Sequence, residues 1–111
     1  MRACQLDVAR LGRITRAEDF ASLRSRGRRQ RGEALSFVVL DDGLEEVRVA
    51  FAFSRKSGIA VNRNLVRRRV KEVFRAADLH PGMYLVLANR KLKDISFADI
   101  VADVTRLTNR N

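Results

Sequence analysis

A chain of 111 residues with 23 Lys and Arg against 13 Asp and Glu has a formal net charge of +10. This length suits one domain, and a hydrophobic content of 46% supports a modest core, which argues against wholesale disorder. No apolar run approaches the roughly 20 residues of a membrane span, no signal-peptide pattern opens the chain, and the lone Cys4 excludes an internal disulfide. We therefore expect one basic, cytoplasmic domain over residues 1–111, with residues 1–12 flexible.

The first predicted helix begins after Thr15 and ends at Gly27. Thr15 and Glu18 have the spacing of a capping box, in which a hydroxyl and a carboxylate each accept a hydrogen bond from a backbone N–H at the helix start. Apolar residues that include Phe20 recur at helical spacing through the segment. Because glycine is a typical C-terminal stop, position 27 marks the expected end of the helix.

Two strands are predicted next, over Leu35–Asp41 and Val47–Phe53. The second alternates Val and Phe with Arg and Ala, which is the period of a strand with one buried face. Residues 41–46 are mostly acidic and contain a glycine, a composition typical of a solvated turn. We therefore expect the two strands to form a hairpin.

Three further elements are predicted in the second half of the chain. A helix over Asn62–Ala77 is followed by a strand over Met83–Ala88, and the last helix begins at Ser96, with Asp99 three residues on. The resulting order, α-β-β-α-β-α, predicts an α+β sandwich with a small central sheet and helices packed on it. The strand–helix–strand unit over 47–88 also predicts a parallel strand pair.

The helix over Asn62–Ala77 has two distinct faces when its residues are placed about 100° apart. Its apolar face, expected to point to the core, comprises Val66, Val70, Val73, Phe74 and Ala77. Its other face comprises Asn64, Arg67, Arg68, Lys71 and Arg75. Arg63 lies in the first turn, and Arg55 and Lys56 follow the preceding strand. A merely solvated face is the ordinary interpretation of such a charged stripe.

Several features favour an anionic partner for this basic face. Like charges four residues apart, as at Arg63/Arg67 and Arg67/Lys71, destabilise a helix by a few tenths of a kcal/mol each, and Glu72 is the only acid nearby. Cations in the first turn also oppose the helix dipole. A phosphate backbone would reverse these unfavourable terms. The basic face therefore predicts nucleic-acid binding, and an anionic membrane is the weaker alternative because the apolar face is committed to a core.

The same segment resembles the signature of the bacterial ribonuclease P protein component. The residues that carry the resemblance are Arg55-Lys56-x-Gly58-x-Ala60-Val61-x-Arg63-Asn64-x-x-Arg67-Arg68-x-x-Lys71-Glu72-x-Phe74-Arg75. The stretches 13–20 and 47–49 also look like the first helix and a strand of that family. Three positions depart from its pattern: the family usually has Lys at position 67, Arg at position 71, and a second aromatic where Arg24 stands here.

The resemblance implies the protein subunit of ribonuclease P, a ribonucleoprotein endoribonuclease that removes the 5′ leader of precursor tRNA. In that family a catalytic RNA with bound Mg²⁺ hydrolyses the phosphodiester, so this chain would supply no catalytic residue and no metal site and would have no activity alone. The implied partners are the catalytic RNA and precursor tRNA, with no protein partner required. The resemblance also implies a left-handed β-α-β crossover, whereas general chain rules predict a right-handed one.

The resemblance assigns roles to residues of this chain. Those implied to face the catalytic RNA are Arg55, Lys56, Arg63, Asn64 and Arg68. Arg67 and Lys71 would contact the leader or neighbouring phosphates, with Arg75 in the same RNA-binding set, and Phe20 and Phe37 would line the cleft that holds the leader. Two alternatives stay open, namely that Phe20 belongs to the core and that Asn64 only supplies a hydrogen bond at the helix start.

Independent catalysis is not expected of this sequence. His80 is the only histidine, and no nucleophile and base can be grouped around it. The acidic residues of 41–46 are better explained by a solvated turn than by a metal site. The alternative function is a small basic RNA-binding module, such as a ribosomal protein, without enzyme association.

Overall fold

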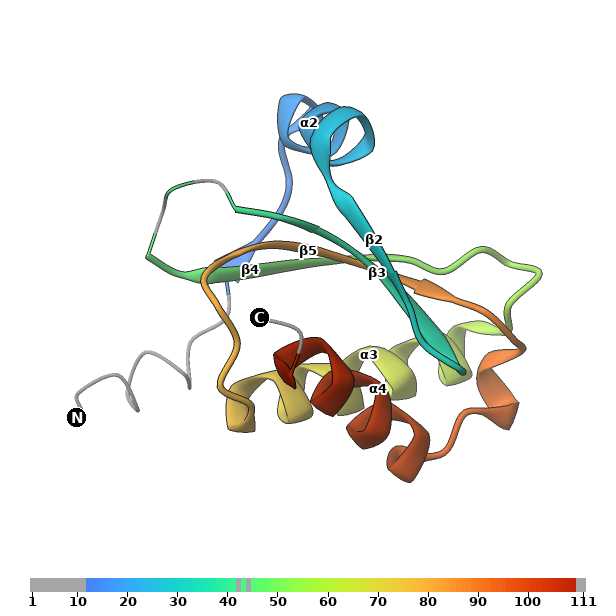
Figure 1. The fold of residues 1–111 in the computed structure, drawn as a ribbon. Coiled ribbons are helices and arrows are strands. Elements are labelled where there is room, and N and C mark those ends of the chain that lie inside the picture. The colour runs from blue at the N-terminus through green and yellow to red at the C-terminus, as the bar shows by residue number, and fades with distance from the viewer. Residues whose placement is uncertain (1–11, 42, 44, 110–111) are drawn as a thin grey trace.

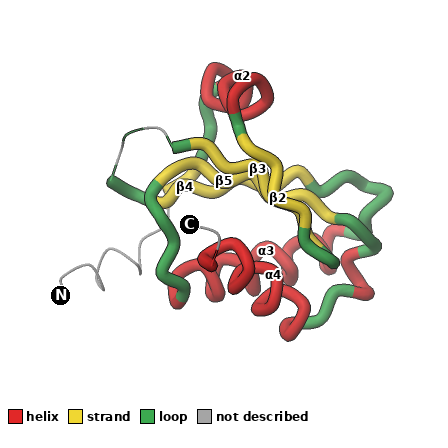
Figure 2. Tube along the Cα trace, in the orientation of Figure 1, coloured by secondary structure: helices red, strands yellow, loops and turns green. Residues whose placement is uncertain are grey.

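The computed structural model describes residues 12–41, 43 and 45–109. Its elements are β1 (Gly12–Arg13), α2 (Ala17–Arg26), β2 (Arg28–Arg31), β3 (Leu35–Leu40), β4 (Val47–Ala52), α3 (Ala60–Ala76), β5 (Gly82–Ala88), a 3₁₀ turn η1 (Leu92–Asp94) and α4 (Phe97–Asn109). Helix α2 lies on one face of the sheet, and α3 and α4 lie side by side on the other (Figures 1 and 2). The predicted α+β sandwich is confirmed.

The five strands have the order β1-β4-β5-β3-β2. β5 pairs antiparallel with β3 and parallel with β4, so the predicted parallel pair around α3 is confirmed. The predicted hairpin of β3 and β4 is wrong, because β5 lies between them. The handedness of the β4-α3-β5 crossover stays a prediction.

The composition of β5 explains why it takes the central position. It is a short, almost continuous apolar run with most residues buried, as expected of a strand covered on both faces. The connection between β3 and β4 must therefore cross the end of β5, and Gly82 lies at this crossing. Gly82 has a φ of 155°, and a Cβ there would approach the Leu40 carbonyl oxygen to 2.7 Å. Glycine is needed at this position because both the backbone angle and the space exclude a side chain.

Two strands were not predicted, and both lie at the edges of the sheet. β1 has two residues and pairs parallel with β4, while β2 has the sequence Arg-Arg-Gln-Arg and pairs antiparallel with β3. Neither carries an alternation of apolar and polar residues. Their extended conformation comes from backbone pairing with a neighbouring strand, which periodicity in a single sequence does not report.

Two apolar clusters lie on opposite faces of the sheet. The larger one packs the sheet against α3 and α4, and its aromatic centre is Phe74, whose ring lies 6.2 Å from that of Phe37 and 5.6 Å from that of Tyr84. The smaller one packs the sheet against α2 and includes Leu23, with half-buried Phe20 at its margin. Alternate residues of β4 enter the two clusters, so the predicted period is confirmed, but the single buried face is wrong because α2 covers Ala50 on the other face.

The boundaries of α2 follow from different contacts than those predicted. Its first flanking residue is Arg16, no side chain caps the helix, and Glu18 forms an ion pair with Arg16 at 2.7 Å instead of a capping box with Thr15. Gly27 does end the helix, but in an extended conformation with a φ of −69°. A Cβ there would lie 2.5 Å from a methyl carbon of Val38, so close packing on β3 explains this glycine.

Most of the segment predicted to be flexible, residues 1–11, lies outside the described residues, and so does Cys4. Gly12, the last residue of that segment, belongs to β1. Within the described ranges, none of the helices has the length and apolar character of a membrane span. The cytoplasmic location stays a prediction.

Candidate nucleic-acid interface

Helix α3 presents its basic face outward because its apolar face is fixed on the sheet. Val66, Val70 and Phe74 are each at most 2% exposed, which confirms the predicted core stripe. The residue before the helix, Ile59, offers no side-chain cap, and the first turn contains no acid. The start of α3 is therefore electropositive from both its backbone N–H groups and its arginines.

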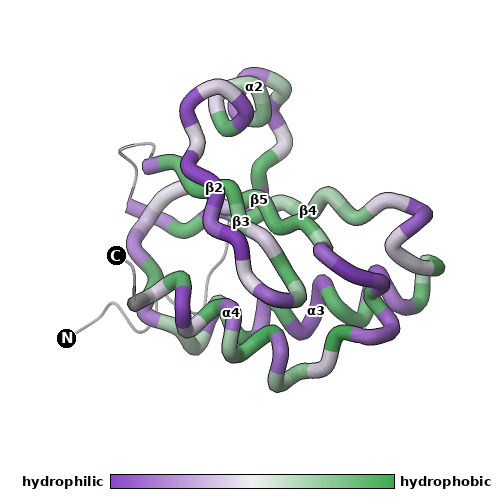
Figure 3. Tube along the Cα trace, turned by 45° about the vertical axis from the view of Figure 1, so that its right-hand side comes forward, coloured by the Kyte–Doolittle hydropathy of each residue, from purple (hydrophilic) through white to green (hydrophobic). Residues whose placement is uncertain are grey.

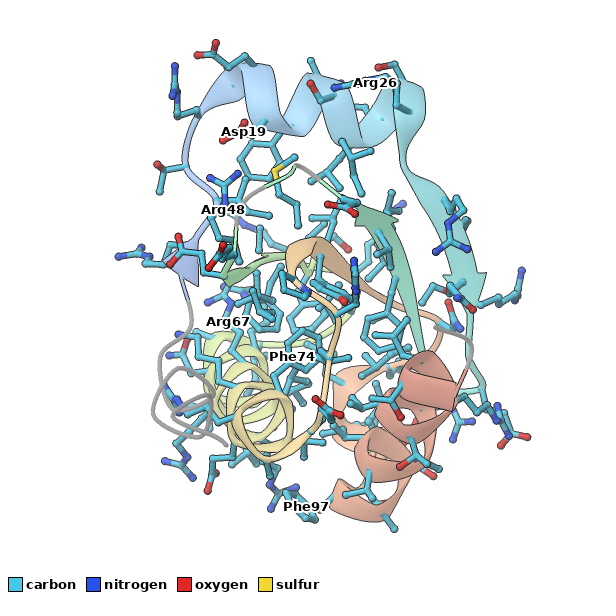
Figure 4. All side chains as sticks on the ribbon, turned by 60° about the vertical axis from the view of Figure 1, so that its left-hand side comes forward. Asp19, Arg26, Arg48, Arg67, Phe74 and Phe97 are labelled. Atoms are coloured by element: carbon cyan, nitrogen blue, oxygen red, sulfur yellow. The ribbon has the colours of Figure 1, made fainter. Side chains whose placement is uncertain are left out.

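A groove of about 830 Å³ runs along the β1–β4 edge of the sheet, between α2 and the basic face of α3. It brings together six of the predicted site residues: Phe20, Asn64, Arg67, Arg68, Lys71 and Arg75. The remaining described lining residues come from β1 and β4 and their flanks: Gly12, Arg13, Ile14, Val49, Ala50 and Phe51. In Figure 4 Arg67 lies on the side of α3 that faces this sheet edge, whereas Phe74 lies between helix and sheet.

The groove combines positive charge with an apolar wall. Arg13 adds a fifth cation to the four from α3, and no carboxylate is among the described lining residues. Arg67 donates a hydrogen bond from Nη1 to Oδ1 of Asn64 at 3.2 Å, which leaves its remaining N–H groups available and orients the guanidinium. Such a surface suits a phosphate backbone whose bases contact apolar and aromatic side chains.

Three of the predicted RNA-binding residues lie outside the groove lining. Arg55 and Lys56 are exposed in the turn between β4 and α3. Arg63 is half-buried and donates a hydrogen bond from Nη1 to the Gly58 carbonyl oxygen at 3.0 Å. Arg63 thus ties the first turn of α3 to the loop that carries Arg55 and Lys56, so these cations form a separate surface at the helix start.

The assignment of Phe37 to a leader cleft is wrong. Phe37 is 1% exposed and packs on Phe74, on the sheet face that α3 and α4 cover. The register of β3 turns Val38 instead toward α2, where it packs in the same cluster as Phe20. A single sequence does not set this register, because β3 is apolar at nearly every position.

Two further features of the site have no signal in the sequence. Arg13 reaches the groove only because β1 pairs with β4, and Arg48 forms a half-buried ion pair with Asp19, at 3.3 Å, that ties the sheet to α2. In Figure 4 Asp19 and Arg48 lie together between helix and sheet. This contact fixes the helix that carries Phe20 over the groove.

A family model described as Ribonuclease P matches residues 8–111. The chain belongs to the ribonuclease P protein family. Its basic face on α3 and the groove beside it are therefore features of a ribonuclease P protein, and the resemblance noted in the sequence is confirmed.

Individual relatives agree with the family assignment. The ribonuclease P protein component of Picosynechococcus is 30% identical over 86% of this chain and 85% of its own length. That of Thermus thermophilus is 37% identical over 73% of this chain, which spans only 48% of that longer relative. The solved ribonuclease P protein of Thermotoga maritima matches the fold with a TM-score of 0.77 over 89% of this chain and 96% of its own, at 24% identity.

The family settles the choice between the two functions that the sequence left open. The chain is the protein subunit of ribonuclease P, and the alternative of a basic module without enzyme association is not favoured. The family name also implies the ribonuclease P RNA as a partner.

Proposed function

We propose that the chain binds the catalytic RNA through the cations at the start of α3 and holds the single-stranded 5′ leader of precursor tRNA in the groove. The observation that carries this proposal is the groove itself, which joins the cations of α3 to Phe20 along one sheet edge. Bases of a single strand can stack on an aromatic or apolar wall while its phosphates meet arginines.

The two basic surfaces have different geometry, which supports different roles for them. The groove is concave, so it suits one flexible strand. Arg55 and Lys56 project from an exposed turn that Arg63 anchors, so they suit the convex backbone of a folded RNA.

We propose that the hydrolysis itself takes place in the RNA, with Mg²⁺ bound mainly there. Among the residues that the structure describes, no group of three or more His, Cys, Asp and Glu side chains could hold a metal ion, so we assign none of them to Mg²⁺. The single histidine, His80, lies 3.3 Å from an Asp41 oxygen and does not line the groove. What this chain's residues do is bind and orient RNA.

Reconstitution tests the assignment. The protein is mixed with a bacterial ribonuclease P RNA at a Mg²⁺ concentration too low for the RNA alone, and release of the leader from precursor tRNA is followed. We expect strong stimulation and no cleavage by the protein alone. Cleavage by the protein alone would contradict the location of the chemistry in RNA.

The groove assignment makes a sharper prediction. Arg67→Ala and Lys71→Ala should each weaken binding of precursor tRNA to the reconstituted enzyme by about tenfold, the effect of one charge-assisted contact. Binding of mature tRNA should change little, because only the precursor has a leader. Arg69→Ala is the matched control, since Arg69 lies on α3 but outside the groove. An equal loss for both RNAs would refute the leader contact.

A further inference from the structure

A second cluster of arginines lies at the opposite edge of the sheet from the groove. It spans the end of α2 and the edge strand β2 and consists of Arg24, Arg26, Arg28, Arg29 and Arg31, all of them exposed. Among the residues that the structure describes, none of these five takes part in an ion pair. Figure 3 shows β2 as a hydrophilic stretch beside the apolar strands. The cluster is therefore a second strongly positive surface, which the proposed function does not use.

The register of the sheet divides the arginines of β2 between its two faces. Residues paired across antiparallel strands point to the same face. Arg29 pairs with Val38, which packs against α2, so Arg29 lies on the α2 face. Arg31 is two residues on and shares that face, whereas Arg28 pairs with Val39 of the opposite cluster.

Two rows of paired residues cross the α2 face of the sheet and end in these arginines. The rows are Ala50–Leu85–Val38–Arg29 and Ala52–Leu87–Ser36–Arg31. The first row lies beneath α2, because Ala50, Leu85 and Val38 pack in the cluster that contains Leu23 of that helix. The second row lies outside this cluster and begins at an exposed alanine, followed by a half-buried leucine and the buried Ser36. The second row thus leads from the β4 edge, next to the groove, to Arg31 over three strand spacings, about 14 Å, and Arg29 lies two residues from Arg31 on the same face.

The turn that follows β2 is held from both faces of the sheet. On one side the buried Asp103 of α4 accepts hydrogen bonds from the backbone N–H groups of residues 33, 34 and 35 at 2.9–3.0 Å. On the other side Asn89 donates to the Gly32 carbonyl oxygen at 2.8 Å and accepts from the Ser36 hydroxyl at 2.7 Å. These bonds fix the position of β2, so its arginines are presented on a rigid edge.

We propose that Arg29 and Arg31 bind the phosphates of leader nucleotides upstream of those in the groove, after the strand has crossed this face of the sheet beside α2, along the second row. The inference rests on the proposed function, because it extends the path of the same leader. An extended single strand suits this surface, since positive groups lie at both ends of the path and the accessible side chains between them, Ala52 and Leu87, are small or apolar. The leader would therefore be held at two sheet edges.

A different explanation of the arginines is protection of an edge strand, since charged side chains there prevent pairing with other chains. Arg29 and Arg31 would then affect self-association and not RNA binding. The two explanations predict opposite results in a binding experiment with leaders of different length.

The test compares reconstituted holoenzymes on precursor tRNAs with leaders of about four and about twelve nucleotides, lengths that bracket a short and a long single-strand site. The double variant Arg29→Ala/Arg31→Ala should bind the long-leader substrate about tenfold more weakly, and its salt dependence should fall by about 0.7 per lost phosphate contact. Its binding of the short-leader substrate should equal that of the wild type. Arg28→Ala/Lys93→Ala is the matched control, because it removes the same charge from the opposite face and from η1.

Three results would overturn the inference. An equal loss at both leader lengths would place the contact on the tRNA body or the catalytic RNA. Unchanged binding of both substrates, with self-association of the double variant in light scattering, would establish edge protection instead. An equal loss of long-leader binding in the control variant would show that the effect comes from net charge alone. Failure of the proposed function would look different, because the wild type itself would then bind precursor and mature tRNA equally.

Discussion

Tyr84 is the only tyrosine of the chain, and its environment shows how much one side chain depends on its position in the fold. It is fully buried in β5, its ring meets Phe74 edge-on, and its hydroxyl donates a hydrogen bond to the His80 carbonyl oxygen. Burial disfavours the charged phenolate and raises the pKa of Tyr84 to about 12, while nearby Arg28 opposes the shift. The neutral phenol is therefore part of the folded state.

This shift predicts a loss of stability at high pH. Because the folded-state pKa lies above the ordinary value of 10, the contribution is complete below pH 10 and is lost as pH rises from 10 toward 12. A pKa shift of about two units corresponds to about 2.7 kcal/mol in the free energy of unfolding. In Tyr84→Phe this part of the pH dependence should vanish, at the expense of about 1 kcal/mol at neutral pH for the lost hydrogen bond.

Urea unfolding of the wild type and of Tyr84→Phe at several pH values measures the difference between their free energies of unfolding. The lysines titrate in the same pH range in both proteins, so their contribution cancels in this difference. The phenolate absorbance of the folded wild type gives the pKa of this single tyrosine directly. A midpoint near 10 in the folded protein would contradict the assigned burial.

At the scale of elements, two helices with similar start signals begin in different ways. In α4 the predicted signal forms a true capping box: Ser96 accepts a hydrogen bond from the Asp99 backbone N–H at 3.1 Å, and the Asp99 carboxylate accepts one from the Ser96 N–H at 3.0 Å. The hydrogen bond from the Ser96 backbone N–H lowers the pKa of Asp99. In α2 the same spacing at Thr15 and Glu18 forms no cap, because Glu18 pairs with Arg16.

The two positions form a matched pair for substitution. Ser96→Ala should lower the free energy of unfolding by about 1 kcal/mol, since it removes the acceptor for a backbone N–H at the start of α4. Thr15→Ala should change it by less than about 0.5 kcal/mol, as for an exposed residue without such a bond. Denaturant unfolding of both variants measures the contrast, and equal losses would show that both boxes form in solution.

At the scale of the whole molecule, positive charge is concentrated at two opposite sheet edges. The groove cations lie at the β1–β4 edge, and the arginines of β2 lie at the other, with the two apolar clusters between them. A net charge of +10 on so small a domain creates self-repulsion in the free protein. Anions that bind the folded state should relieve that repulsion.

Inorganic phosphate should therefore stabilise the free protein more than chloride at equal ionic strength. A tenfold excess of phosphate over its dissociation constant would raise the free energy of unfolding by about 1.4 kcal/mol. Because phosphate also strengthens hydrophobic burial in general, the informative comparison is between variants. Arg67→Ala/Lys71→Ala should lose part of the increment, whereas Arg69→Ala/Lys93→Ala should keep it. An equal increase in the free energy of unfolding of both variants would show that phosphate acts through the solvent and not by binding in the groove.

Local patterns in the sequence predicted most of the elements and half of the interface. The helix over 60–76 has a strong period, so its buried and exposed faces were predicted correctly. The strand over 47–52 was predicted to have one buried face, but α2 also covers Ala50 on the other face. The basic face of α3 followed from the same helical period, which places Asn64, Arg67 and Lys71 on one side whatever the helix packs against.

Features that depend on residues a few positions apart could be predicted from the chain alone: the amphipathic helices, the alternating strand, the positive charge of α3 and the family motif. Features that depend on strand pairing required the folded structure: which strands are neighbours, that Phe37 faces the core, that Arg13 reaches the groove, and that Arg29 and Arg31 share a face with Phe20. This difference arises because strand pairing joins distant segments through backbone hydrogen bonds. Those bonds are nearly independent of side-chain type, and a shift of one residue in register reverses every face.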